Sequence, residues 1–196
     1  MSKLKGLISF ILLLVIGLIF YFITQNKELN LNGTQLMNFV SKVKTDSNLD
    51  FVFETVKNER IELDVEDKIF KIKGMEEKTV FLKVFGWDCK YCKKEIPELV
   101  NLKNELGDSF EIIAIEAQQY SNEESLKYIK EYGINYHIVP GEAHSKFYAY
   151  LQEKYGWTGI IPLTIVISKG GNVLAFELGA KSFSLSELMK AALLRE

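Results

Sequence analysis

The only two cysteines of this 196-residue chain, Cys89 and Cys92, stand three positions apart in the stretch WDCKYCKKEIP. A run typical of a buried strand, Thr79–Phe85, precedes them, and an amphipathic helical pattern follows over Tyr91–Leu106. A C-x-x-C pair between a strand and a helix allows three interpretations. It is part of a zinc site, a structural disulfide, or a dithiol that exchanges electrons.

The surrounding sequence favours electron exchange. A structural zinc ion takes four ligands, but His137 and His144 lie far downstream and no second C-x-x-C motif exists. A disulfide that closes so short a loop adds little stability. The unpaired N–H groups and the dipole of the helix would stabilise a thiolate at Cys89, and Cys92, one turn further in, suits a resolving role. We therefore expect no metal and no other cofactor.

From Thr79 onward the chain alternates strand and helix patterns, which predicts an α/β domain. The expected strands are Thr79–Phe85, Phe110–Ala117, Tyr136–Val139, Leu163–Ser168 and Val173–Leu178, and the expected helices are Tyr91–Leu106, Ser121–Tyr132, Ala143–Tyr155 and Leu185–Leu194. S-x-x-E capping boxes at Ser121 and Ser184 start the second and the fourth of these helices. Upstream, Phe51–Thr55 and Arg60–Leu63 predict a β-hairpin, and Lys68–Lys73 predicts a further short strand.

The first part of the chain has the properties of a membrane anchor. Leu7–Ile23 contains no charged residue, and its length of about 25 Å as a helix is close to the thickness of a bilayer core. Lys3 and Lys5 precede the run, so the positive-inside rule places everything after it outside the cytoplasm. The residues that follow, TQN, offer no small-residue cleavage site. We therefore expect an uncleaved signal anchor in the cytoplasmic (inner) membrane, with the C-terminal domain on the periplasmic or extracytoplasmic side.

Three parts of the chain are predicted: the transmembrane anchor over residues 1–24, a linker over 25–49, and the α/β domain over 50–196. Within the linker, Gly33–Lys44 has apolar residues at helical spacing.

The chain has 24 basic and 26 acidic residues and no basic run, which argues against nucleic-acid binding. Both cysteines are expected on the side of the membrane where thiols tend to be oxidised.

The order of these features resembles a known family. The C-x-x-C motif after a strand, Pro97 in the following helix, and Pro162 in the later stretch IIPLT before a strand are similar to the thioredoxin fold. More narrowly, Cys92–Pro97 matches the C-x-x-E-x-P pattern of the membrane-anchored TlpA/ResA/CcmG-like thiol–disulfide oxidoreductases. The chain differs in having Asp88, where that group has tryptophan, before the first cysteine. The resemblance implies a thioredoxin-like fold, a mixed central sheet flanked by helices, with an N-terminal transmembrane helix and a β-hairpin extension.

The resemblance also implies roles for individual residues. Cys89 is the attacking thiol, Cys92 is the resolving thiol, and Pro162 is a cis-proline that faces them. A cis Ile161–Pro162 bond would leave the backbone of Ile161 free to pair with an extended substrate chain. Glu95, three residues after Cys92 and on the same helical face, is expected to move protons as the disulfide opens.

The expected function is that of a membrane-tethered reductase of protein disulfides in the bacterial envelope. By the resemblance, its substrates include apocytochrome c during cytochrome c biogenesis, and a membrane thiol-reductant transporter re-reduces the pair. Two alternatives remain open at this point. One is a disulfide isomerase or oxidase on the same scaffold, which Lys90-Tyr91 between the cysteines favours. The other is a non-enzymatic copper-delivery protein that binds the metal through Cys89, Cys92 and His137.

Overall fold

The computed structural model of the protein describes residues 48–141 and 144–195. The predicted anchor, Leu7–Ile23, and the predicted linker helix, Gly33–Lys44, lie outside these residues. The anchor and the division of the chain at residues 24 and 49 therefore remain predictions. Within the described ranges, no helix combines the length and the apolar character needed to cross a membrane.

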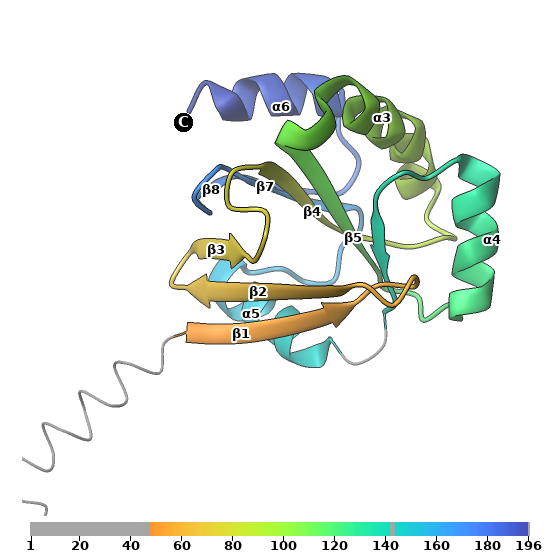
Figure 1. The fold of residues 1–196 in the computed structure, drawn as a ribbon, viewed down its shortest axis with the longest axis horizontal. Coiled ribbons are helices and arrows are strands. Elements are labelled where there is room, and N and C mark those ends of the chain that lie inside the picture. The colour runs from red at the N-terminus through yellow and green to blue at the C-terminus, as the bar shows by residue number, and fades with distance from the viewer. Residues whose placement is uncertain (1–47, 142–143, 196) are drawn as a thin grey trace, which may run out of the picture. The chain divides into compact units, whose positions relative to one another are not determined.

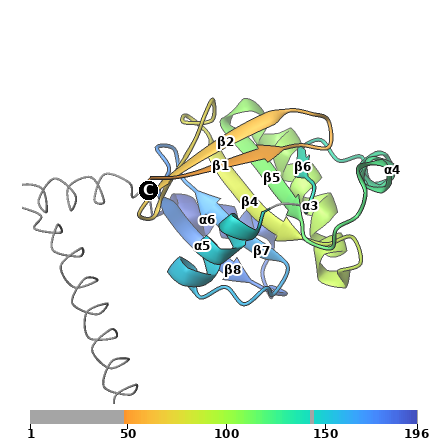
Figure 2. The same cartoon turned by 90° about the horizontal axis from the view of Figure 1, so that it is seen from below.

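The strands form two sheets, which Figures 1 and 2 show from two directions. The smaller sheet is antiparallel, has the order β1-β2-β3, and consists of Asn48–Glu54, Arg60–Glu66 and Ile69–Ile72. The larger sheet has the order β6-β5-β4-β7-β8 and consists of β4 (Thr79–Phe85), β5 (Phe110–Glu116), β6 (His137–Val139), β7 (Leu163–Ile167) and β8 (Val173–Leu178). In it β4, β5 and β6 run parallel, whereas β7 is antiparallel to β4 and to β8. This mixed central sheet and the preceding hairpin confirm the α/β part of the predicted fold and its β-hairpin extension, whereas the transmembrane helix stays a prediction.

The helices follow the periodicity of the sequence closely. They are α3 (Lys90–Leu106), α4 (Asn122–Tyr132), α5 (Ser145–Tyr155) and α6 (Leu185–Leu193), with a short 3-10 turn, η2 (Gly107–Ser109), after α3. Both predicted capping boxes are present, and in each the serine hydroxyl accepts the backbone N–H of the glutamate three residues later. Because that bond satisfies an otherwise unpaired donor, it fixes where α4 and α6 begin.

The central sheet has a hydrophobic core on each face, since side chains alternate between the two faces along a strand. In Figure 1, α3 and α6 lie on one side of the sheet, and α5 and the smaller sheet lie on the other. The core on the side of α3 and α6 includes Phe81, Ile112, Val166, Ile96, Leu99 and Leu188. The opposite core includes Leu82, Ile113, Ile165, Phe147, Phe53 and Leu63. The hairpin extension is therefore part of the domain's core rather than an appendage.

Two hydrogen bonds tie the smaller sheet to the larger one. The N–H of Val56, in the turn after β1, donates to the carbonyl of Ile138 on β6 at 2.9 Å. The N–H of Phe70 on β3 donates to the carbonyl of Gly171, in the turn between β7 and β8, at 2.7 Å. Gly171 has a φ of +95° and lies against the Phe70 backbone, so only glycine fits there without strain.

Candidate active site at the start of helix α3

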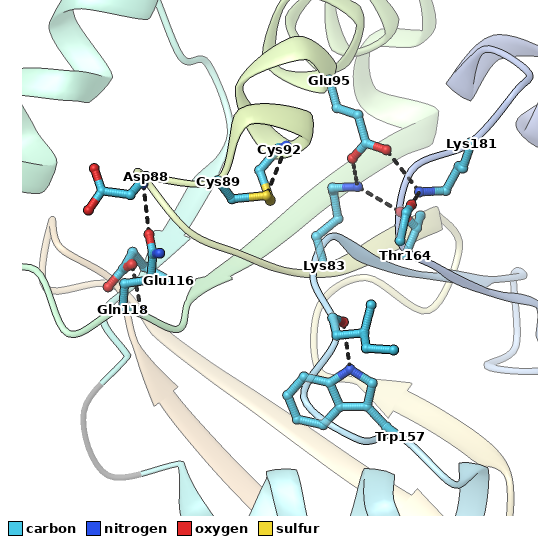
Figure 3. Close-up of a disulfide and its surroundings, with 12 residues drawn as sticks. Lys83, Asp88, Cys89, Cys92, Glu95, Glu116, Gln118, Trp157, Thr164 and Lys181 are labelled. Atoms are coloured by element: carbon cyan, nitrogen blue, oxygen red, sulfur yellow. Dashed lines mark hydrogen bonds and ion pairs between the residues drawn. A yellow bond between two sulfur atoms is a disulfide. The ribbon is translucent and has the colours of Figure 1, made fainter.

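Cys89 and Cys92 are joined by a disulfide at the N-terminus of α3. Cys89 is the N-cap residue, and its Sγ accepts the backbone N–H of Cys92 at 3.1 Å (Figure 3). Cys89 is half-buried, whereas Cys92 is only 2% exposed and belongs to the core on the α3 side. The two sulfurs are therefore unequally buried: that of Cys89 lies at the start of the helix, and that of Cys92 lies inside the domain.

Trp87, two residues before the first cysteine, is a core residue. Its side chain is fully buried, and its indole N–H donates to the Ser125 hydroxyl on α4 at 3.1 Å. The indole also stacks on Tyr128 of α4, with ring centroids 4.7 Å apart. Trp87 thus attaches the loop that carries the cysteines to α4.

Asp88 is exposed beside Cys89 and is held by the loop after β5. Its N–H donates to the Gln118 side chain, and its carboxylate accepts the Tyr120 hydroxyl, both at 2.7 Å. That second bond raises the pKa of Tyr120. The loop itself is fixed by Glu116, whose carboxylate accepts the N–H groups of Gln118 and Tyr120 at 2.7 and 3.0 Å. A negative charge is therefore positioned next to the outer cysteine.

The peptide bond between Ile161 and Pro162 is cis, as the resemblance implied. It lies immediately before β7, and β7 pairs with β4, the strand that leads to the cysteines. Cys89 and Ile161 both pack against the core cluster that contains Cys92. In the part of the chain that the structure describes, no hydrogen bond uses the backbone of Ile161.

Glu95 lies in a buried cluster with two lysines, as Figure 3 shows. One carboxylate oxygen, Oε2, accepts from Lys83 of β4 at 2.7 Å, and the other, Oε1, accepts from Lys181 at 2.8 Å. Lys83 also donates to the Thr164 hydroxyl of β7 at 2.6 Å. Glu95 is thus neither a solvated surface residue nor an isolated acid, because both of its oxygens have a cationic partner.

Sequence reasoning missed both lysines of this site, Lys83 and Lys181. The side chain of Lys83 is almost completely buried, and burial lowers the pKa of Lys83 to about 8, although the Glu95 carboxylate opposes that shift. The signal was present, since Lys83 is the only charged residue of the otherwise mostly apolar strand TVFLKVF. Lys181 follows β8 in a loop, where no periodicity indicates burial.

The structure does not bring the histidines to the cysteines. His137 lies on β6 opposite Ile113 of β5, and its Nδ1 is 2.9 Å from the Glu59 carboxylate. The Nε2 of His144 is 2.7 Å from the carbonyl of Pro140, and burial lowers the pKa of His144. Among residues 48–141 and 144–195, no three cysteine, histidine or carboxylate side chains converge on a metal position. The alternative copper set of Cys89, Cys92 and His137 is therefore wrong, because the position of β6 in the sheet holds His137 elsewhere.

A C-x-x-C disulfide that caps the helix after β4, together with a cis-proline before the neighbouring strand, defines a thioredoxin-like protein with a dithiol–disulfide pair. A family model gives a more specific assignment. The model of the AhpC/TSA family matches residues 52–176. The chain belongs to this family.

Curated relatives and solved structures agree with this assignment. The chain is 29% identical over 130 residues to the thiol-disulfide oxidoreductase ResA of Halalkalibacterium halodurans, and 29% identical over 136 residues to that of Bacillus subtilis. These alignments cover 63% and 69% of this chain, respectively, and 67% of each relative. ResA of Bacillus anthracis is 27% identical, and its alignment covers 61% of this chain and 65% of that relative. The chain thus spans about two thirds of the length of these relatives. The predicted likeness to the ResA group is confirmed.

Among solved structures, a thiol:disulfide interchange protein from Chlorobium tepidum has a TM-score of 0.56 at 21% identity and covers 74% of this chain and 92% of its own. StoA from Bacillus subtilis has a TM-score of 0.50 at 18% identity, and the match covers 73% of this chain and 96% of the StoA chain. At these identities the structures support the fold alone. Fold, family and cysteine pair together are those of a thiol–disulfide oxidoreductase.

Proposed function

We propose that the protein is a membrane-tethered reductase of protein disulfides on the extracytoplasmic side of the cytoplasmic membrane. The observation that carries the proposal is the unequal burial of Cys89 and Cys92 at the start of α3. A disulfide reductase needs this inequality, because one thiol must reach a protein substrate and the other must reach only the first thiol. The name that the curated relatives share, thiol-disulfide oxidoreductase, supports this activity.

The exchange proceeds in two steps from the reduced pair. The Cys89 thiolate attacks one sulfur of the substrate disulfide, a new S–S bond forms, and the other substrate sulfur leaves as a thiolate and takes up a proton. The Cys92 thiol then loses its proton and attacks the Cys89 sulfur. This forms the internal disulfide and releases the second substrate sulfur, which is also protonated. The substrate gains two electrons from the pair and two protons, which balance the proton lost by Cys92 and one taken from solvent.

Exposed apolar side chains beside the pair suit an extended polypeptide substrate. Tyr91, between the two cysteines, and Ile160, next to Ile161, are each 51% exposed. An extended chain that paired with the backbone of Ile161 would place alternate side chains toward the domain. A C-x-x-C-H segment of apocytochrome c is a substrate of this kind, and a membrane thiol-reductant transporter would return electrons to the pair.

The direction of electron flow is tested by the reduction potential of the Cys89–Cys92 pair. We expect a value of roughly −270 to −220 mV, near the thioredoxin end of the scale. The physical reason is Asp88, whose carboxylate beside Cys89 disfavours the strongly stabilised thiolate on which oxidants depend. Equilibration with glutathione or dithiothreitol buffers measures the potential. A value near about −120 mV, as in a strong oxidant, would reject the reductase and favour the oxidase or isomerase.

The tether is tested by fractionation of cells that express the full chain. We expect the protein in the membrane fraction and resistant to extraction by carbonate, because Leu7–Ile23 supplies an uncharged segment of about 25 Å. Replacing two central residues of that segment by arginine should release the protein or block its export, since each charge is costly in the bilayer core. Recovery of a soluble protein trimmed after this segment would show a cleaved signal peptide instead.

A further inference from the structure

The buried cluster around Glu95 holds more positive than negative groups. Lys83 and Lys181 are both bound to the one carboxylate of Glu95, and the three side chains are between 2% and 12% exposed. Figure 3 shows the two ammonium groups directed at the same carboxylate from different elements. A buried charge without a close partner is costly. The other carboxylate that acts on Lys83 belongs to Glu98, which is exposed, so the buried groups alone hold one negative charge fewer than positive charges while the cysteines form a disulfide.

The reduced form of the protein can supply that charge at Cys92. Cys92 and Glu95 are three residues apart on α3 and are both buried, so they occupy neighbouring positions on one helical face. Lys83 reaches this face from β4 (Figure 3). Apolar burial opposes ionisation of a thiol, whereas a nearby cation favours it. In this position Cys92 needs a cation if it is to attack as a thiolate at neutral pH.

We propose that Lys83 is a positioning residue for the resolving step, whose buried ammonium group enables the Cys92 thiol to ionise. The inference rests on the proposed thiol–disulfide exchange and deepens it. The proton of the Cys92 thiol leaves to solvent, and the thiolate supplies the electron pair of the new bond to Cys89. The bond between Cys89 and the substrate breaks, and the substrate sulfur leaves with that electron pair.

The groups that face Lys83 are consistent with this role. Glu95 and Glu98 from α3 favour its charged form, Lys181 and burial oppose it, and Thr164 from β7 accepts its hydrogen bond. In the disulfide form the balance brings the pKa of Lys83 to about 8, so its proton is lost as the pH rises through that value. By linkage, a thiolate at Cys92 would hold this proton to higher pH, just as the ammonium group favours the thiolate.

The test is an ultraviolet titration of the Cys92 thiolate in a Cys89→Ser background, where no other thiol absorbs. Lys83→Met should raise the midpoint pH by about one unit or more, a tenfold fall in the ionisation constant. Lys83→Arg should restore most of the effect because it keeps the charge. Glu95→Gln should move the midpoint the opposite way, to lower pH, because it removes the negative group that competes with the thiolate for the lysines.

Lys94→Met is the matched control. It removes one lysine charge two residues from Cys92, but Lys94 is exposed, so solvent and salt screen it and the midpoint should stay in place. An unchanged midpoint in Lys83→Met, or a rise in Glu95→Gln, would overturn the inference. If Lys83→Met failed to fold, Lys83→Arg and Glu95→Gln would still decide. The titration uses no substrate, so a reductase that failed in turnover assays would leave its outcome unaffected.

Discussion

Replacing Cys92 by alanine is expected to convert the protein into a trap for its substrates. Cys89 can still attack a substrate disulfide, but the mixed disulfide persists because no second thiol remains to break it. Turnover of an insulin-type disulfide substrate should fall by on the order of a thousandfold or more. Non-reducing gels of envelope extracts, with and without dithiothreitol, measure the trapped adducts.

Cys89→Ala is the matched control, since it should abolish turnover to the same extent and trap far less. The reason is the position of Cys92, which is buried under the start of α3 where an incoming protein cannot reach it. Adding Ile161→Asp to the Cys92→Ala variant should lower the yield of adducts, because a charge disfavours an apolar chain beside the pair. Equal trapping by the two cysteine variants would show that the attacking thiol has been assigned to the wrong residue.

Replacing Trp87 by alanine is expected to cost about 3–5 kcal/mol in the free energy of unfolding. The substitution removes a fully buried indole, uncovers the Tyr128 ring, and leaves the Ser125 hydroxyl without its donor. This is a large fraction of the roughly 5–15 kcal/mol that stabilises a typical domain. Urea unfolding of the oxidised protein, followed by circular dichroism, measures the loss.

Ser125→Ala separates the hydrogen bond of the Trp87 indole from the packing of its ring. It removes only the hydrogen-bond acceptor of the indole, so about 1–3 kcal/mol is expected. If Trp87→Ala cost no more than Ser125→Ala, the indole would contribute through its hydrogen bond alone and the packing argument would be wrong. In that case the attachment of the cysteine loop to α4 would depend on a single polar contact.

Much of the fold could be predicted because its signals are local. The capping boxes at Ser121 and Ser184 each lie within four residues, and the apolar stripe of α3 repeats at the helical period. The hairpin of β1 and β2 was found from alternation around a short turn. Each of these patterns can be read without knowing which elements come together in space.

The buried cluster of Glu95, Lys83 and Lys181 could not be predicted from local patterns. Lys83 and Glu95 are 12 positions apart, and Lys181 is 86 positions from Glu95. Their contact depends on the packing of α3 over the sheet and on the path of the loop after β8. The charge of Lys83 in a buried strand signalled a missing partner, but the sequence did not identify that partner. His137 shows the converse, since its residue type suggested a metal ligand and its strand placed it beside Glu59.

The hydrogen bond from the Cys92 N–H to the Cys89 sulfur makes that sulfur, the attacking atom of the proposed mechanism, the cap of its own helix. A thiolate is a charged acceptor and holds such a donor more strongly than an uncharged sulfur does. The first turn of α3 is therefore most firmly fixed when Cys89 is ready to attack. It is held less firmly once that sulfur is bonded to a substrate, which is the stage at which Cys92 must approach. In the proposed cycle one helix end would therefore loosen and re-form, and hydrogen exchange at the Cys92 amide would report the redox state of the protein.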